Sequence, residues 1–190
     1  ILYLEQKQFK LANKVADELL SAQSDNVDFL NIKAAILIKL KKLNLAKPLV
    51  KQVLDKQPGH FSALFNLSTI YAAEQNYKEA IFWYKQCIRP LPEAVGPQTR
   101  SYYDLNPHIQ LMFCHDALKD YIQANHHNNK ALEIAPNDSG LLHNKEYYNS
   151  LLQPSTVIQN FEKVAWFGSE VDINFPSYRI RAYNMHLTLN

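Results

Sequence analysis

The feature that most constrains the fold is a pair of amphipathic patterns, back to back, in residues 61–92, FSALFNLSTIYAAEQNYKEAIFWYKQCIRPLP. Each pattern places apolar or small residues three or four positions apart, which is the spacing along one face of an α-helix. These residues are Leu64, Leu67, Ser68 and Tyr71 in the first pattern, and Tyr77, Ala80, Tyr84 and Cys87 in the second. Pro92 closes the stretch, which therefore predicts two helices that pack against each other.

The same order of residue types recurs at two other places, which indicates an internal repeat. A shift of 34 residues towards the N-terminus aligns residues 27–60, and a shift of 44 residues towards the C-terminus aligns residues 105–138. The matching residues are Leu30, Ala34, Leu37, Leu43, Ala46, Val50, Val53 and Pro58 in the earlier unit, and Leu111, Met112, Tyr121, Ala124, Ala131 and Pro136 in the later one. Units of this length bury their apolar faces by stacking on their neighbours.

This order of large, small and aromatic residues over 34 positions resembles the tetratricopeptide repeat (TPR) family. The resemblance implies an all-α fold over residues 1–152, a right-handed superhelix of stacked helical hairpins. Its parts are a half unit at 1–26, repeats at 27–60, 61–94 and 105–138, and a capping helix at 139–152. The half unit has no preceding neighbour, so we expect Leu4, Phe9 and Leu19 to be partly uncovered and available for self-association.

Polar residues and prolines predict where individual helices begin. Asp25 or Asn26 can cap the helix that opens the repeat at 27–60, because either side chain accepts bonds from the free amides of a first turn. Pro48 lies inside the next helical pattern. Because proline lacks an amide donor, we expect that helix to begin close to Asn44.

Ten extra residues precede the last repeat and lie around residues 94–104. Gly96 and Pro97 punctuate this segment, and Asn106 followed by Pro107 predicts a helix start. One interpretation is a recognition loop that binds through Arg100, Tyr102 and Tyr103. The alternative is a surface excursion without a function, or a longer first helix.

Composition limits the classes of partner. With 47% apolar and 20% charged residues the chain is an ordinary globular protein, and a net charge of +2 is too small to predict binding to nucleic acid. The longest apolar run, residues 34–38, is far too short to span a membrane. Cys87 and Cys114 fall where the repeat places small buried residues, so we expect buried thiols in a reducing compartment, the cytoplasm.

No arrangement of residues predicts catalysis or metal binding. Cys114, His115 and Asp116 are adjacent, so on a helix they point in different directions, and we expect a buried thiol beside a surface histidine. The run Asn125-His-His-Asn-Asn129 is interpreted as a polar outer face, since its histidines are not three or four positions apart. We therefore expect no catalytic residue, no metal and no cofactor in this part of the protein.

The resemblance implies a binding groove, which in TPR proteins is lined by the first helix of each repeat. The positions that face it hold amides, a hydroxyl and aromatic rings: Asn31, Phe65, Asn66, Thr69, Gln110, Phe113, Asn144 and Tyr147. Members that grip a terminal carboxylate use lysines and an arginine as well. This sequence lacks those cations, so we expect a protein or an extended peptide as partner, or alternatively a glycan.

The periodicity changes after a linker at 153–162. Residues 163–168 form a short apolar run of strand length, and residues 177–189 form an amphipathic pattern, as in the first strand and helix of an α/β domain. This tail resembles the start of retaining GT-B glycosyltransferases, and residues 105–148 look like TPR segments attached to bacterial glycosyltransferases. The matching tail residues are Gly168, Pro176, Ser177, Tyr178, Arg179, Ile180 and Arg181.

The tail resemblance implies an anion-binding corner at Ser177, Arg179 and Arg181, and a sugar nucleotide as the cofactor of a parent enzyme. The function predicted from the sequence is then a TPR scaffold within a larger glycosyltransferase whose catalytic domain begins at residues 163–190. This part alone is not expected to be active. The alternative is a stand-alone TPR adaptor without a catalytic domain.

Overall fold

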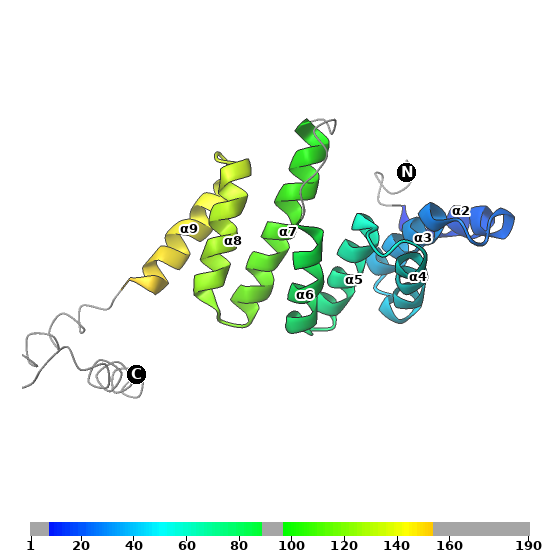
Figure 1. Ribbon diagram of the computed structural model, residues 1–190, viewed down its shortest axis with the longest axis horizontal. Coiled ribbons are helices and arrows are strands. Elements are labelled where there is room, and N and C mark those ends of the chain that lie inside the picture. The colour runs from blue at the N-terminus through cyan, green and yellow to red at the C-terminus, as the bar shows by residue number, and fades with distance from the viewer. Residues whose placement is uncertain (1–7, 89–96, 154–190) are drawn as a thin grey trace, which may run out of the picture. The chain divides into compact units, whose positions relative to one another are not determined.

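The computed structural model describes residues 8–88 and 97–153, and for residues 97–102 it describes the backbone alone. Within these ranges every regular element is an α-helix, as the sequence predicts (Figure 1). The helices are α2 (Phe9–Ala22), α3 (Val27–Lys39), α4 (Leu43–Lys56), α5 (Phe61–Ala73), α6 (Tyr77–Cys87), α7 (Pro97–Ala117), α8 (Tyr121–Ile134) and α9 (Ser139–Leu152). The predicted strand at 163–168 and the helix at 177–189 lie outside the described residues.

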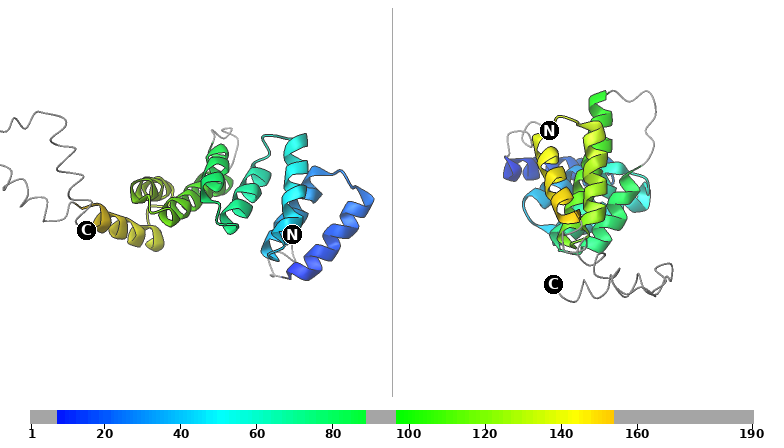
Figure 2. Two further views of the ribbon diagram at one scale, coloured as in Figure 1. Left: turned by 90° about the horizontal axis from the view of Figure 1, so that it is seen from below. Right: turned by 90° about the vertical axis from the view of Figure 1, so that its left-hand side faces the viewer.

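Neighbouring helices pack in chain order from α2 to α8, and α3 also packs on α5 (Figures 1 and 2). The chain divides into two compact units, residues 1–149 and 150–190. In the second unit the described residues are the last residues of α9 and Gln153. The first unit holds the core and the predicted groove.

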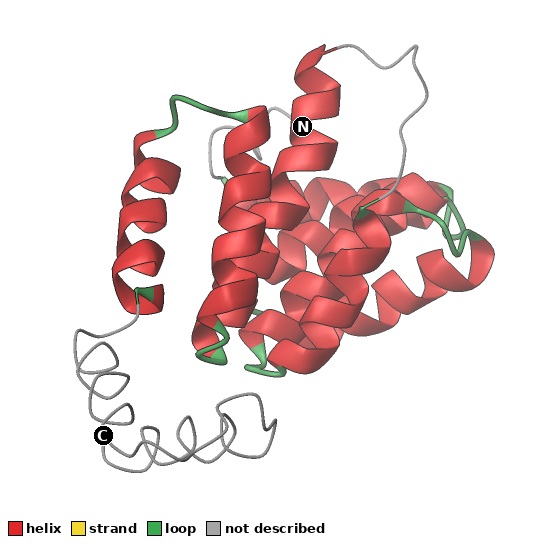
Figure 3. Ribbon diagram, turned by 60° about the vertical axis from the view of Figure 1, so that its left-hand side comes forward, coloured by secondary structure: helices red, strands yellow, loops and turns green. Residues whose placement is uncertain are grey.

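The three pairs α3/α4, α5/α6 and α7/α8 are closed by the same turn (Figure 3). Its middle residue is in the left-handed region, with φ of 59° at Lys41, 60° at Gln75 and 60° at Lys119. The next amide bonds a carbonyl five residues back, from Lys42 to Leu37, from Asn76 to Tyr71 and from Asp120 to His115. The turns thus recur after 34 and 44 residues, the same shifts that align the sequence.

Side-chain caps set the starts of several helices. Asn26 Oδ1 accepts bonds from the amides of Asp28 at 3.0 Å and Phe29 at 3.1 Å, which confirms Asn26 as the cap of α3. Helix α4 begins at Leu43, next to the expected Asn44, and Pro48 lies within it. His60 Nδ1 caps α5 by accepting from the amide of Ala63 at 3.2 Å.

The predicted helix start at Asn106 and Pro107 is wrong. Helix α7 already begins at Pro97, so both residues lie in its interior. Pro107 is fully buried, and packing of its ring offsets the one backbone hydrogen bond that a proline removes. Most of the extra segment is therefore a longer first helix, which was the alternative interpretation, while residues 94–96 lie outside the described range.

The apolar core is continuous along α3, α4 and α5, with Lys33 and Ser68 as buried polar residues on the same helices. Its buried members are Leu30, Ala34, Leu37, Ala46, Val50, Val53, Ala63, Leu67 and Ile70. Each fully buried leucine, valine or isoleucine side chain in this core stabilises the fold by about 1.5–3 kcal/mol. At the other end Leu141 and Tyr148 of α9 pack on Met112, Ala124 and Ala131, so α9 covers the α7/α8 pair as a capping helix would.

Helix α2 covers α3 through Ala12 and Ala16, which pack on Ile36. Lys33 is buried and forms an ion pair with Asp17 of α2. Leu11 and Leu19 on α2 are exposed, as the sequence predicted for Leu19. Leu4 lies outside the described residues.

Candidate functional site

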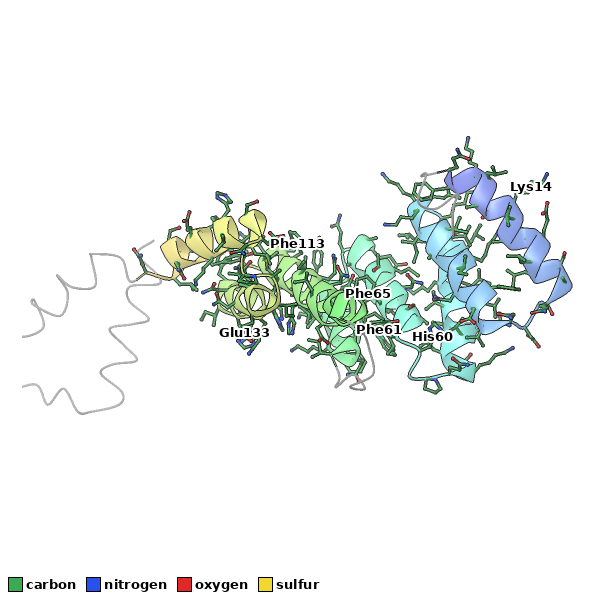
Figure 4. All side chains as sticks on the ribbon, turned by 90° about the horizontal axis from the view of Figure 1, so that it is seen from above. Lys14, His60, Phe61, Phe65, Phe113 and Glu133 are labelled. Carbon is green, nitrogen blue, oxygen red and sulfur yellow. The ribbon has the colours of Figure 1, made fainter. Side chains whose placement is uncertain are left out.

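The eight predicted groove residues come from the alternate helices α3, α5, α7 and α9, and none of their side chains is buried. Six are half-buried, and the aromatic rings of Phe113 and Tyr147 are 55% and 46% exposed. Phe65 lies on α5 and Phe113 on α7 (Figure 4). These side chains sit on the packed helices and still reach solvent, as a contact surface requires.

Two of the amides connect first helices of neighbouring repeats. Asn66 Nδ2 on α5 donates to Asn31 Oδ1 on α3 at 2.9 Å. A carboxamide carries two donors and an acceptor with two lone pairs, so this pair can still bond a ligand. No described residue bonds Asn31 Nδ2 or Asn66 Oδ1, and these two groups are free to bind a peptide group.

Phe65 and Thr69 are held in place by Tyr84 of α6. The rings of Phe65 and Tyr84 are 5.2 Å apart in an edge-to-face arrangement, and Thr69 Oγ1 lies 3.1 Å from the Tyr84 hydroxyl. Tyr84 is fully buried, and this burial raises the pKa of its phenol. The Phe65 ring is therefore a fixed wall of the surface.

Asn144 joins the last two first helices, since its Nδ2 donates to Met112 Sδ at 3.4 Å. Tyr147 lies one helical turn further on and packs beside Tyr148 with ring centroids 5.3 Å apart. Burial, and after it the neighbouring Asp116 carboxylate, raise the pKa of Tyr148. The helix α9 thus contributes an amide that holds α7 and a ring that remains exposed.

Charges are few at the groove positions of the four helices. In TPR proteins the second and twelfth positions of a repeat also face the groove, and here they include Asp28 on α3 and Asp116 on α7. Neither these positions nor the eight predicted groove residues hold lysine or arginine. A single carboxylate of a partner would find no guanidinium or ammonium group there. The arrangement suits a neutral or basic segment of a partner.

Tyr103 is not part of a free recognition loop. Its ring lies 4.2 Å from that of Phe61 on α5 and therefore helps to join α7 to α5. The side chains of Arg100 and Tyr102 lie outside the described residues, as do Ser177, Arg179 and Arg181. The predicted anion-binding corner stays a prediction.

The sequence interpretation of the histidines is wrong at two places. His115 is 6% exposed and not a surface residue, although Cys114 is buried as expected. In the run at 125–129, His127 is 6% exposed and Asn128 is fully buried, while His126 is exposed. His127 and Asn128 lie three and four residues after the buried Ala124, so the helical spacing carried the signal that residue type obscured.

The described residues contain no group of three or more His, Cys, Asp or Glu side chains that could hold a metal ion. Among the helices of the described ranges, none combines the length and hydropathy needed to cross a membrane. Cys87 and Cys114 are both buried.

Comparison with known proteins supports the fold. Residues 61–89 match the family model described as tetratricopeptide repeat. No curated protein matched the chain. The described architecture, helical pairs with a common turn and a repeating register, is that of TPR proteins.

Solved structures of low sequence identity share this fold. The structure titled MamA 41-end from Desulfovibrio magneticus RS-1 is 17% identical over 90% of this chain and 91% of that chain, with a TM-score of 0.63. YrrB, described as a TPR protein with an unusual peptide-binding site, is 20% identical over 76% and 69%, with a TM-score of 0.59. Naa15/Naa10 bound to HypK-THB is 22% identical over 80% of this chain and 21% of that one, with a TM-score of 0.58.

Proposed function

We propose that this chain is a protein-interaction scaffold that binds an extended, uncharged or basic peptide segment of a partner along α3, α5, α7 and α9. One observation carries the proposal: the eight predicted positions all reach solvent on alternate helices, and they offer amides and aromatic rings without a cation. The likeness to YrrB, whose title names a peptide-binding site, points in the same direction.

The chemistry of the site fits a peptide backbone. The open amide groups of Asn31 and Asn66 can accept from a peptide N–H and donate to a peptide carbonyl, which fixes the direction of an extended chain. The fixed ring of Phe65 and the exposed ring of Phe113 offer apolar contacts for side chains of that segment. Binding energy concentrates in such aromatic anchors.

A peptide array provides the test. Neutral, basic and acidic 12-residue peptides are screened against the full chain, and the affinity of the strongest peptide is measured by calorimetry. Phe113→Ala is expected to weaken binding about tenfold or more, as for an aromatic anchor. The matched control is Phe82→Ala, because Phe82 is 53% exposed but lies on α6, outside the groove.

Asn66→Ala tests the amide pair in the same assay. It is preferred to the double change Phe65→Ala with Asn66→Ala, because loss of Phe65 also removes its contact with Tyr84. If Phe113→Ala and Phe82→Ala bind the peptide alike, the groove assignment is rejected. Strong binding to a glycan array but to no peptide would replace the peptide with a glycan as partner.

A separate proposal concerns the larger protein to which the repeats belong. We infer from the tail, with Gly168, Ser177, Arg179 and Arg181, that the repeats belong to a glycosyltransferase whose catalytic domain starts at residues 163–190. The support is sequence resemblance alone. Reading the coding sequence after Asn190 tests it, since a long α/β pattern supports the enzyme and an immediate stop codon leaves the stand-alone adaptor.

Two further proposals rest on single features. The exposed Leu11 and Leu19 of α2 support self-association, which light scattering of wild-type and Leu19→Lys protein would detect as a loss of oligomer. The burial of Cys87 and Cys114 supports a cytoplasmic location, which fractionation of cells would test.

A further inference from the structure

Three histidines meet between α7 and α8. His108 Nδ1 lies 3.0 Å from His127 Nδ1, and the centroids of these two rings are 5.2 Å apart. The ring of His115 stacks on the ring of His127, and the centroids of these two rings are 5.5 Å apart. We call these residues the histidine cluster. Because one nitrogen must donate and the other accept, the short contact requires at least one neutral ring.

The position of the cluster in the repeat shows what it replaces. The same positions, 78 residues earlier, hold Leu30, Leu37 and Leu49, which pack in the core of the α3/α4 pair. In the repeat between them they hold Leu64, Tyr71 and Trp83. The third helix pair therefore fills with three imidazole rings a space that the α3/α4 pair fills with leucines and the α5/α6 pair with leucine, tyrosine and tryptophan.

The charged and titratable groups around His127 offer its protonated form no compensation. They are His108 and His115 on α7, His126 on α8 and Lys85 on α6. The nearby carboxylates belong to other rings: Asp120 Oδ2 lies 3.1 Å from His115 Nδ1, and Asp104 and Glu133 act on His108 together with Lys130. Burial, and then the neighbouring histidines and Lys85, lower the pKa of His127 to about 3.

The pKa values of His108 and His115 are shifted in the same direction as that of His127. Burial lowers the pKa of His108 and of His115, and for His115 it outweighs the opposing effect of Asp120. His115 Nε2 is buried and has no hydrogen-bond partner, so a proton added there would be left without an acceptor. All three rings are stable in this packing as neutral groups.

We propose that the α7/α8 pair is an acid-sensitive switch, in which protonation of the histidine cluster separates α8 from α7 while the apolar α3/α4 pair stays closed. Gln110 and Phe113 lie on α7 between His108 and His115. Opening would therefore loosen the part of the groove that these two residues form. That consequence rests on the proposed function, whereas the opening itself does not.

The direction follows from linkage. The pKa of a histidine in an opened segment is about 6.5, above that of the buried His127, so the open form binds protons first. The closed form is fully favoured above about pH 6.5 and loses this advantage as the pH falls towards 3. For His127 alone the opening constant rises about 30-fold between pH 8 and pH 5.

Hydrogen exchange of the full chain tests the switch. Protection factors, normalised to the intrinsic exchange rate at each pH, are compared between α7/α8 and α3/α4 at pH 8 and pH 5. We expect protection of α7/α8 to fall about 30-fold and that of α3/α4 to change little. An equal loss in both pairs, or no loss in either, overturns the proposal.

Variants assign the effect to the cluster. His108→Leu, His115→Leu and His127→Leu together introduce the residues of the first repeat and should abolish the selective loss at pH 5. His143→Gln, at an exposed position of α9, is the matched control and should keep it. If the triple variant retains the loss, the cluster is not the sensor.

A measurement on the wild-type protein covers the case in which the triple variant does not fold. The NMR signal of the His127 ring is followed during acidification, together with the backbone signals of α8. The ring is expected to gain its proton only as those signals change. Protonation of His127 above pH 6 with α8 still packed would overturn the switch, whatever the binding assays show.

Discussion

The α3/α4 and α7/α8 pairs share one backbone turn and one register but differ in what fills the space between the helices. In the first pair the contacts are made by Leu30, Leu37 and Leu49, together with Val50 and other aliphatic residues. In the second pair the equivalent positions hold the histidine cluster and Asn128. The comparison shows that helical spacing sets burial, whereas residue type sets how the buried contact responds to pH.

The largest effect is expected when a histidine is moved into the apolar pair. Leu37→His should lower the free energy of unfolding by about 2–4 kcal/mol at pH 8, because it removes a buried aliphatic side chain and buries an imidazole without a partner. The loss should be larger at pH 5, since a charged ring is disfavoured there. Urea unfolding at both pH values measures it, with Leu45→His at an exposed site as control. Equal losses at the two pH values would contradict the comparison.

The next largest effect concerns the wild-type protein itself. Because the folded-state pKa of His127 lies below its unfolded value, acidification from pH 8 to pH 5 should remove about 2 kcal/mol through this residue alone. Urea unfolding at half-unit pH steps measures the slope, which should start near pH 6.5. A stability that stays constant across this range would contradict the assignment, as would an unchanged slope in His127→Leu.

A smaller effect is expected for the polar contact that joins α9 to the α7/α8 pair. Asn128 Nδ2 donates to the carbonyl of Leu141 at 2.9 Å inside the core. Asn128→Ala should lower stability by about 1–2 kcal/mol, because it removes this bond and part of the buried volume. Thermal unfolding measures it against Gln123→Ala, at an exposed position of α8. A difference below the error of the measurement would show that packing of Leu141 and Tyr148 alone holds α9.

The smallest effect is expected on the groove surface. Phe113→Ala and Phe82→Ala should each change the free energy of unfolding by no more than about 0.5 kcal/mol, because both rings are more than half exposed. The melting temperature of the two variants provides the measurement. A large loss in Phe113→Ala would mean that this ring supports α7 and is not reserved for a partner.

Much of the fold could be predicted from the sequence because the repeat signal is periodic and carried by many residues. The helix pairs, the Asn26 cap and the start of α4 near Asn44 follow from spacing and capping. The start of α7 did not, because Pro107 has the form of a first-turn proline and its buried environment cannot be read locally. The cluster was missed for a related reason: histidine and asparagine were interpreted by polarity, although Ala124 and Ala131 place His127 and Asn128 on the buried face.

For the candidate site too, the sequence indicated some features and not others. Spacing indicated which side chains would reach solvent on the first helices, and Phe113 and Tyr147 do so. It could not indicate that Asn66 bonds Asn31 or that Tyr84 fixes Phe65, because these contacts join residues that only packing brings together.

The shared turn has a consequence for how such a chain can vary. Lys41, Gln75 and Lys119 adopt a left-handed conformation that glycine would accept without strain, and the same backbone bond follows each of them. The same bend thus forms in the α3/α4 pair, which packs leucines between its helices, and in the α7/α8 pair, which packs histidines there. A leucine could be exchanged for a histidine in one hairpin without altering the curvature of the others, so that individual units acquire their own chemistry while the array keeps its form.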